Sequence, residues 1–295
     1  MATTLASARI RLRNVLFTTD FSRSAEAALP YLHALARWYG AKVCIAHVVP
    51  PEPRLSVPLD VLPAAIDRQR QWAERKMSEL ETNEWLRDVE HKQVLRQGEL
   101  WYALSSIITQ EHIDLLVTAT HGREGLSKLF LGSSAEAIFR GARCPVLTVG
   151  PKVTGGDVRF ENFKNILFAT DFSAASVHAL PYALSMAQEN QARLIMTHIM
   201  TMVPYQHREA VIQDETKRLK ALLPTKDMEW CQAEFAVSFQ FPAEGILEVA
   251  ESYRADLIVM GVRHGDTPRL ASHLPWTTAY DVVCGAKCPV LTVRG

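Results

Sequence analysis

The segment that decides the fold is residues 14–22, NVLFTTDFS, because it recurs almost unchanged as residues 165–173, NILFATDFS. Two further motifs recur in the same order: ALPY at residues 28–31 and 179–182, and CPVLTV at residues 144–149 and 288–293. Solenoid repeats are only about 20 to 45 residues long, so a repeat of this length indicates a duplicated domain.

The stretch between the two copies has the composition of a linker. Residues 150–163 contain Pro151, Gly155 and Gly156 among scattered charges. A chain of 295 residues also has the length expected for about two domains. We therefore expect one domain at residues 1–152 and a second at residues 153–295.

The overall composition excludes several classes of protein. The 32 basic and 32 acidic residues cancel, so no basic excess points to nucleic acid or to an anionic membrane surface. The first residues lack the apolar stretch of a signal peptide, and later apolar runs are too short to span a membrane. Five sparse cysteines do not form a disulfide framework, which favours a cytoplasmic protein.

Within one copy, short apolar runs alternate with segments of helical periodicity. Strands are predicted at residues 14–19, 42–49, 93–96, 113–118 and 146–149, and helices at residues 24–39, 60–87, 100–111 and 134–140. Gly40 follows the first helix where a C-cap glycine belongs. Because the strands are continuously apolar, they predict a five-stranded, mostly parallel, Rossmann-like α/β sheet covered by helices on both faces.

Ligands of such sheets bind at the carboxyl ends of the strands, where the strand order reverses. Asp20 follows the first strand and has two readings: it holds a turn or caps a helix, or it accepts hydrogen bonds from a nucleoside. His47 and His198 end matching strands. Most histidines in such places are packed and hydrogen-bonded rather than catalytic.

A glycine-containing loop follows the fourth strand. Gly122 and Gly125 permit tight turns, and Gly132 with Ser133 opens the next helix. Amides at a helix start such as Ser133 and Ser134 form an anion site, so the loop predicts a phosphate cradle. The same SSAE segment also fits a capping box, which explains the serines but leaves the three glycines unexplained.

Motifs of other chemistries are absent from the sequence. The chain has no dinucleotide fingerprint, no P-loop and no nucleophile elbow. His264, Asp266 and His273 share one loop without metal-site spacing, so we expect no metal site. No base or nucleophile is assembled by the sequence, so we predict no catalytic residue and at most slow hydrolysis of a bound nucleotide.

Taken together, the TDFS strand end, the glycine loop and the closing CPVL strand resemble the universal stress protein family over nearly the whole chain. The nucleotide motif of that family is Gly-x2-Gly-x9-Gly-Ser/Thr, and repeat one matches it from Ala119 to Ser133 except for alanine at the first glycine. The resemblance implies a site for ATP, accompanied by Mg²⁺. Thr19, Asp20 and Val48 would meet the adenosine end, and the loop through Ser134 would meet the phosphates.

The departures from the motif differ between the repeats. The methyl group of Ala119 is a small change, so we expect weakened binding in repeat one. In repeat two, His264 replaces the second glycine and Trp276 aligns with Gly132, so we expect no ATP binding of the usual kind there.

Single-domain members of the family dimerise, often through the last strand. The resemblance therefore implies that residues 146–149 and 290–293 pair within this chain as a pseudo-dimer, and it is compatible with a homodimer of whole chains.

Three functions follow from these observations. The leading one is a stress-response or signalling protein that binds an adenine nucleotide in repeat one. The alternative is a family-like interaction module that does not bind ATP, with a protein partner that the sequence does not name. An adenylate-forming enzyme is the third, and it is disfavoured because residues 20–24, DFSRS, lack the glycines of a pyrophosphate loop.

Overall fold

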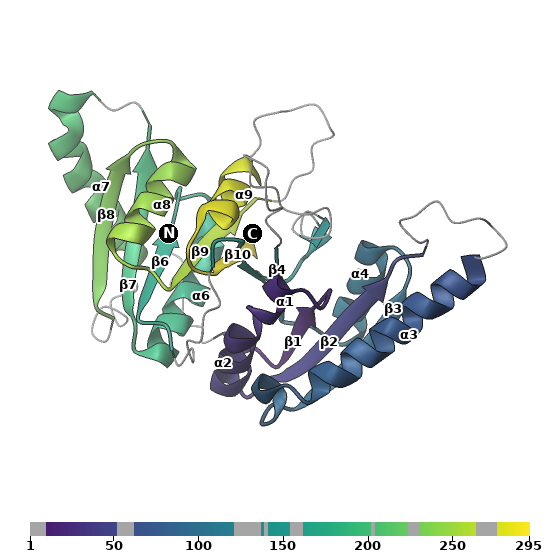
Figure 1. Cartoon of the computed structure of the whole chain (residues 1–295). Helices are drawn as coiled ribbons and strands as arrows, with labels where there is room; N and C mark the ends of the chain where they lie inside the picture. Colours follow the sequence, from purple (N-terminus) through teal and green to yellow (C-terminus); the bar gives the residue numbers. More distant parts are fainter. Residues whose placement is uncertain are drawn as a thin grey trace.

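Figure 1 shows two α/β units joined near the centre of the molecule in the computed structural model of the chain. The residues that the structure describes are 10–51, 62–120, 137–138, 141–153, 162–201, 204–223, 231–263 and 276–295.

Repeat one alternates strands and helices as predicted. Its elements are β1 (Asn14–Thr18), α1 (Arg23–Glu26), α2 (Leu29–Tyr39), β2 (Lys42–Val49), α3 (Leu62–Glu81), the 3-10 helix η1 (Glu84–Leu86), β3 (His91–Gln97), α4 (Leu100–Gln110), β4 (Leu115–Ala119) and β5 (Val146–Val149). Gly40 ends α2 in the left-handed conformation, with φ of 60°. Of the helix predicted at residues 134–140, only residues 137–138 are described, and they are helical.

Repeat two has the same order of elements. They are β6 (Asn165–Ala169), α6 (Ala174–Asn190), β7 (Arg193–Met200), the 3-10 helix η2 (Tyr205–His207), α7 (Arg208–Leu222), β8 (Ala233–Phe239), α8 (Pro242–Ser252), β9 (Leu257–Val262), α9 (Trp276–Gly285) and β10 (Val290–Arg294).

The predicted helix at residues 60–87 is wrong at its end. Helix α3 stops at Glu81, and the chain then forms the separate turn η1. The cause is local: the Asn83 side chain accepts a hydrogen bond from the Trp85 amide at 3.0 Å and so caps a new turn. Asparagine side chains compete in this way with the hydrogen bonds of a continuing helix.

All ten strands form one sheet, in the order β3-β2-β1-β4-β5-β10-β9-β6-β7-β8. Strands within each repeat are parallel, whereas β5 and β10 pair antiparallel, with Leu147 opposite Leu291. The predicted pairing of the two last strands within one chain is therefore confirmed. The switch point of repeat one, where the strand order reverses, lies between β1 and β4.

The hydrophobic core differs between the two faces of this sheet. On the face covered by α2, α3, α6 and α7, here called the α2 face, one buried cluster runs through both repeats and includes Leu147 and Leu291 at the seam. On the opposite face, here called the α4 face, two separate clusters lie under α4 and under α8 with α9. The two repeats therefore share the core on the α2 face, and each has a separate core on the α4 face.

Phe163, the last residue of the predicted linker, is fully buried in the shared core. Its ring lies 6.5 Å from the ring of Tyr31 and 5.4 Å from that of Trp38, both on α2 of the other repeat. Burial, with smaller contributions from Cys288 and Asp256 of repeat two, raises the pKa of Tyr31 to about 12. The entry into repeat two is thus anchored on repeat one.

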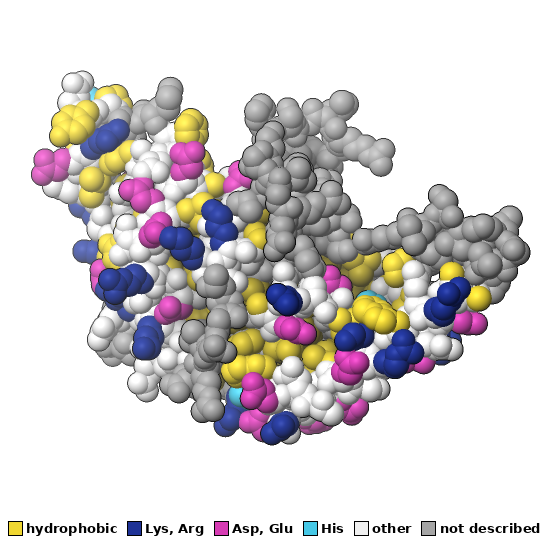
Figure 2. Space-filling model, in the orientation of Figure 1, with side chains coloured by type: hydrophobic (Ala, Val, Ile, Leu, Met, Phe, Trp, Pro, Cys, Tyr) yellow, Lys and Arg dark blue, Asp and Glu magenta, His cyan; other side chains and the backbone are white. Residues whose placement is uncertain are grey.

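The surface and the cysteines agree with the composition. Basic and acidic side chains are interspersed on the face drawn in Figure 2. All five cysteines carry free thiols. Within the described ranges, no helix combines the length and the apolar character needed to cross a membrane.

The first helical segment differs between the repeats. The helix predicted at residues 24–39 is divided into α1 and α2, whereas α6 runs unbroken even though Pro181 lies within it. The strand beneath carries Ala119 in repeat one and Gly261 in repeat two. A Cβ atom at Gly261 would lie 2.2 Å from the carbonyl oxygen of Ala175 in the first turn of α6. We attribute the break in repeat one to the methyl group that Ala119 places here.

We therefore expect Gly261→Ala to lower the free energy of unfolding by about 1–3 kcal/mol, as overpacking does in tight contacts. The control is Ala119→Gly, where no clash is created and only the backbone entropy of about 0.5–1 kcal/mol is lost. Urea unfolding followed by circular dichroism measures both. Equal unfolding midpoints for Gly261→Ala and wild type would contradict the close approach.

Candidate functional site

The turn after β1 is held by its own side chains. The Asp20 carboxylate accepts a hydrogen bond from the Ser22 amide at 3.1 Å, and the Thr19 hydroxyl accepts one from the Phe21 amide at 2.9 Å. Ser22, not Asp20, caps α1, because its hydroxyl accepts from the Ala25 amide at 3.2 Å. Of the two structural roles predicted for Asp20, the one in the turn is confirmed and the helix cap is not.

Phe21 adopts a left-handed backbone conformation, with φ of 60°, and Phe172 does the same in repeat two, with φ of 59°. For a bulky residue this conformation costs of order 1–3 kcal/mol and persists only where the surroundings enforce it. The ring of Phe21 lies 4.6 Å from that of His47, which helps to enforce it. This strain was not predicted from the sequence, where its only signal is the TDFS segment that both repeats share.

His47 anchors the same turn through its imidazole. Its Nδ1 atom lies 2.8 Å from the carbonyl oxygen of Thr19, and His198 makes the same contact with Thr170 at 2.8 Å. A carbonyl oxygen only accepts, so Nδ1 carries the proton. Burial lowers the pKa of His47, opposed by the hydrogen bond to Thr19 and the charge of Asp20. The interpretation of both histidines as packed and hydrogen-bonded is confirmed.

Three threonine hydroxyls lie on the α4 face at the switch point, and we call Thr18, Thr118 and Thr120 the threonine floor. The hydroxyls of Thr18 and Thr118 are 3.0 Å apart across β1 and β4. Thr120 follows β4 two residues after Thr118 and so shares its face. Thr118 is 5% exposed and Thr120 is 2% exposed, so these are buried polar groups.

The hydroxyl of Thr120 has no hydrogen-bond partner among the described residues, and neither does that of Thr148 on the neighbouring strand β5. A buried hydroxyl left unpaired costs about 1–3 kcal/mol. In the described part of repeat one, a buried hydrogen-bonding group therefore stays unpaired at the point where ligands bind in sheets of this type.

Repeat two replaces the threonine floor with apolar side chains. The three equivalent positions are Ala169, Met260 and Val262, and all three belong to its α4-face hydrophobic cluster. Outside the floor, Thr148 on the α4 face keeps its counterpart, Thr292, and Thr19 in the turn keeps Thr170. This contrast was not predicted from the sequence, because the glycine motifs alone do not show which residues share a face of the sheet.

Some of the remaining predicted site residues lie in the part of the chain that the structure describes, and others do not. Val48 packs against the α4-face cluster of repeat one, and Ala119 ends β4 beside the shared core without a positive φ. Gly122, Gly125, Gly132, Ser133 and Ser134 lie outside the described residues, as do the loop residues His264, Asp266 and His273. No cluster of His, Cys, Asp and Glu able to hold a metal occurs within the described ranges.

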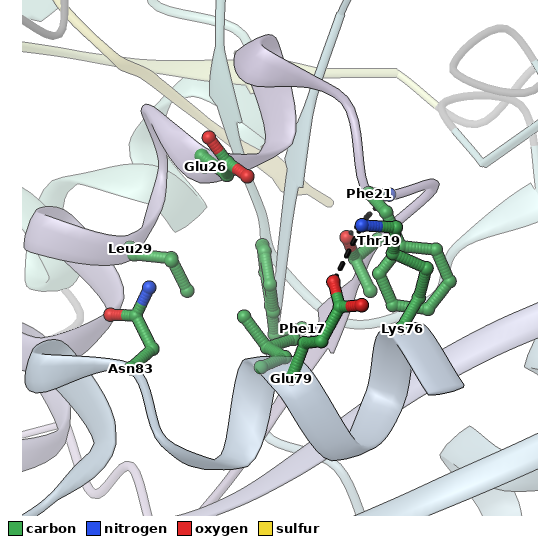
Figure 3. Close-up of a pocket in the computed structure, with 9 residues that line it drawn as sticks. Phe17, Thr19, Phe21, Glu26, Leu29, Lys76, Glu79 and Asn83 are labelled. Atoms are coloured by element: carbon green, nitrogen blue, oxygen red, sulfur yellow. Dashed lines mark hydrogen bonds and ion pairs between the residues drawn. The ribbon is translucent and has the colours of Figure 1, made fainter. Parts of the chain in front are cut away.

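A small cavity of about 110 Å³ lies on the α2 face, behind the strand-end turn. Figure 3 shows Phe17 and Thr19 facing the Lys76–Glu79 ion pair of α3, with Glu26 on the opposite wall. Ligand pockets of proteins measure roughly 300–1,000 Å³. This cavity is too small for a nucleotide and lies on the other face from the threonine floor.

The carboxylate at the strand end of repeat two forms an ion pair. The guanidinium of Arg263 lies 2.8 Å from the carboxylate of Asp171, the equivalent of Asp20. Burial would raise the pKa of Asp171, but hydrogen bonds from Ser173, Ser176 and Arg263 together lower it to about 2. An arginine of the same chain therefore occupies this carboxylate.

The phenylalanine ring of this turn also contacts different side chains in the two repeats. In repeat two, the guanidinium of Arg218 lies 4.0 Å above the ring of Phe172 and pairs with the buried Glu215 at 2.8 Å. In repeat one, Trp72 makes the corresponding contact with Phe21, at 5.5 Å between ring centroids.

The chain consists of two doubly wound parallel domains that are joined through their last strands. Each domain has, at its switch point, a turn that a histidine holds in place. These features define a tandem protein of the adenine nucleotide α-hydrolase-like class. The chain belongs to the universal stress protein family, whose profile matches residues 11–150 and 162–294.

The chain is similar to a curated relative and to solved structures of other proteins. A universal stress protein of Thermus aquaticus, encoded in the QAH/OAS sulfhydrylase 3′ region, is 35% identical over 138 residues, 45% of this chain and 99% of that relative. The crystal structure of a universal stress protein from Archaeoglobus fulgidus has a TM-score of 0.73 at 19% identity, covering 97% of this chain and 99% of its own. A universal stress protein solved in complex with cAMP is 23% identical over 45% of this chain and 97% of its own, with a TM-score of 0.33.

The ion pair in repeat two predicts that a substitution of Arg263 will change the pKa of Asp171. We expect Arg263→Gln to raise the pKa of Asp171 from about 2 toward its ordinary 3.8, because one of the three groups that stabilise the carboxylate loses its charge. Carboxyl carbon NMR between pH 1.5 and 6 measures the change, with Arg193→Gln, at the separate Glu234 ion pair, as the control.

Because the pKa of Asp171 is lower in the folded chain, its contribution to stability is present above about pH 4 and is lost as the pH falls toward 2. That pH dependence should weaken in Arg263→Gln. An unchanged Asp171 titration in Arg263→Gln would show that the ion pair does not form in solution.

Proposed function

We propose that this universal stress protein binds an adenine nucleotide, ATP with Mg²⁺, in repeat one, and that repeat two is its structural partner. The observation that carries the proposal is the strand-end turn at the switch point of repeat one, with Asp20 on β1 and the buried hydroxyls beside it. Ligands of doubly wound sheets bind at this point.

The residues present at this point suit a nucleoside. Asp20 and the threonine floor supply hydrogen-bonding groups, and Val48 supplies an apolar surface on the next strand. The hydroxyl of Thr120, which has no partner in the described ranges, is a group that a bound ligand would satisfy. We assign the phosphates to the loop from Gly122 to Ser134, on its sequence pattern alone.

The assignment to repeat one rests on what repeat two has lost. There Arg263 pairs with Asp171, and the apolar residues Ala169, Met260 and Val262 replace the floor. A nucleoside in repeat two would have to displace an arginine and would meet apolar side chains at the three positions equivalent to the floor. These differences support one nucleotide per chain.

We assign no residue a catalytic role, and we propose a nucleotide-dependent signalling protein rather than an enzyme. Five free thiols, four of them buried, suit the reducing cytoplasm, where we place the protein. Among the described residues, the oppositely directed and paired β5 and β10 supply the dimer contact within one chain.

The test is to purify the chain, denature it, and identify and count the released nucleotide by chromatography and mass spectrometry. We expect about one ATP per chain, and a higher melting temperature when ATP is added. Asp20→Asn should weaken ATP binding roughly tenfold to a hundredfold, because it removes a charged acceptor. Gly132→Trp, which copies the residue of repeat two, should abolish binding.

Asp171→Asn is the matched control, because it makes the same change in repeat two and should leave ATP binding intact. Parallel titrations with ATP and cAMP compare a linear and a cyclic nucleotide. No retained nucleotide and no thermal shift with millimolar ATP or cAMP would favour the interaction module instead. Two nucleotides per chain would overturn the assignment of repeat two.

A further inference from the structure

We propose that the threonine floor of repeat one hydrogen-bonds to the sugar of the bound nucleotide and makes the site selective for ribonucleotides. This inference rests on the proposed function, since it names the part of the nucleotide that the floor contacts. It concerns Thr18, Thr118 and Thr120, which lie outside the glycine loop.

The position of the floor supports a direct contact with the ligand. Thr18 and Thr118 lie on β1 and β4, the two strands that flank the switch point, and their hydroxyls are 3.0 Å apart. Both residues are at or next to the carboxyl ends of their strands. A ligand in the crevice at this point would lie against these hydroxyls.

The order of side chains across the sheet indicates which part of the nucleotide lies over the floor. Strands β2, β1 and β4 are neighbours, about 4.8 Å apart in such sheets. On the α4 face, β2 presents the apolar Val48, whereas β1 and β4 present hydroxyls. The chain then continues from β4 into the glycine loop. A base over Val48 would therefore place the attached sugar over the floor, and the loop assigned to the phosphates on its sequence pattern follows β4 directly in the chain.

The chemistry of the floor matches a sugar. A threonine hydroxyl is both a donor and an acceptor, as is each hydroxyl of ribose. The Thr18–Thr118 pair uses one donor and leaves the other available, and Thr120 has both functions unpaired among the described residues. Three neighbouring groups of this kind suit a diol better than they suit an apolar or an anionic group.

The loss of the floor in repeat two is specific. The three floor positions become Ala169, Met260 and Val262, whereas Thr148, one strand further from β1, keeps a threonine counterpart in Thr292. If the floor hydroxyls served only the fold, repeat two, with the same fold, would have no reason to lose these three and keep the fourth. The hydroxyls accompany the proposed site rather than the sheet.

Thr120→Val in the full chain separates a ligand contact from a structural role, because valine keeps the shape and removes the hydroxyl. Replacing an unpaired buried hydroxyl with an apolar group should leave stability without ligand unchanged or raised. Binding of ATP should become roughly fivefold to tenfold weaker, the effect of one neutral hydrogen bond. Thr118→Val should act in the same direction on binding.

Thr148→Val is the matched control, since Thr148 is also buried and unpaired among the described residues but lies outside the floor. It should leave the Kd for ATP unchanged. The sugar contact is tested with 2′-deoxyATP and 3′-deoxyATP by isothermal titration calorimetry. In wild type at least one analogue should bind roughly tenfold more weakly than ATP. In Thr120→Val that ratio should fall to about one.

An unchanged ratio of Kd values in both Thr118→Val and Thr120→Val would overturn the sugar contact while the proposed function stands. Lower stability together with unchanged ATP binding would show a purely structural floor, with the same consequence. Failure of wild type to bind ATP or either deoxy analogue would instead remove the proposed function, and this inference with it.

Discussion

The antiparallel pairing of β5 with β10 is the constraint on which the rest of the structure depends. Each repeat alone would end its sheet at an apolar, unpaired edge, and exposed edges of this kind invite aggregation. Pairing the two edges gives one ten-stranded sheet and one core that crosses the seam. The strands of the two repeats run in opposite directions. The carboxyl ends of the strands of repeat one therefore point away from those of repeat two. Ligands at the two strand ends cannot touch, and any influence between them passes through the seam.

Much of the fold could be predicted because it follows from local patterns. Continuous apolar runs located the strands, and the bounds of β2 and β5 were predicted to the residue. The failures have local causes as well. Asn83 starts a new turn where helical periodicity continues. We attribute the break between α1 and α2 to the methyl group of Ala119, because the equivalent Gly261 lies close to the backbone of α6. Such effects arise from atoms in contact, which periodicity does not describe.

The candidate site was predictable in its place but not in its chemistry. The duplicated TDFS pointed to the strand-end turn, whereas the strain at Phe21 and its support by His47 needed the structure. The threonine floor left a signal in the sequence, since Thr118 and Thr120 stand at the end of an otherwise apolar run. Reading that signal requires knowing that the two residues share a face with Thr18 on a strand distant in sequence.

The two strand ends show how similar backbones serve different purposes. In repeat two, Arg263 pairs with the Asp171 carboxylate, and apolar side chains pack at the positions equivalent to the threonine floor. Both features favour stability. Repeat one retains a buried hydroxyl with no partner among the described residues, and thus forgoes that stability. Natural proteins accept such local costs mainly where a ligand is bound.

The covalent joining of the repeats has a consequence for how this protein changes over generations. In a dimer of identical chains, every mutation appears twice, so a change that spoils one site spoils both. Here the two halves are held together by β5 and β10 yet encoded separately. One half can therefore drift toward a scaffold while the other remains under selection, and the pair keeps the architecture of a symmetric dimer without its symmetry.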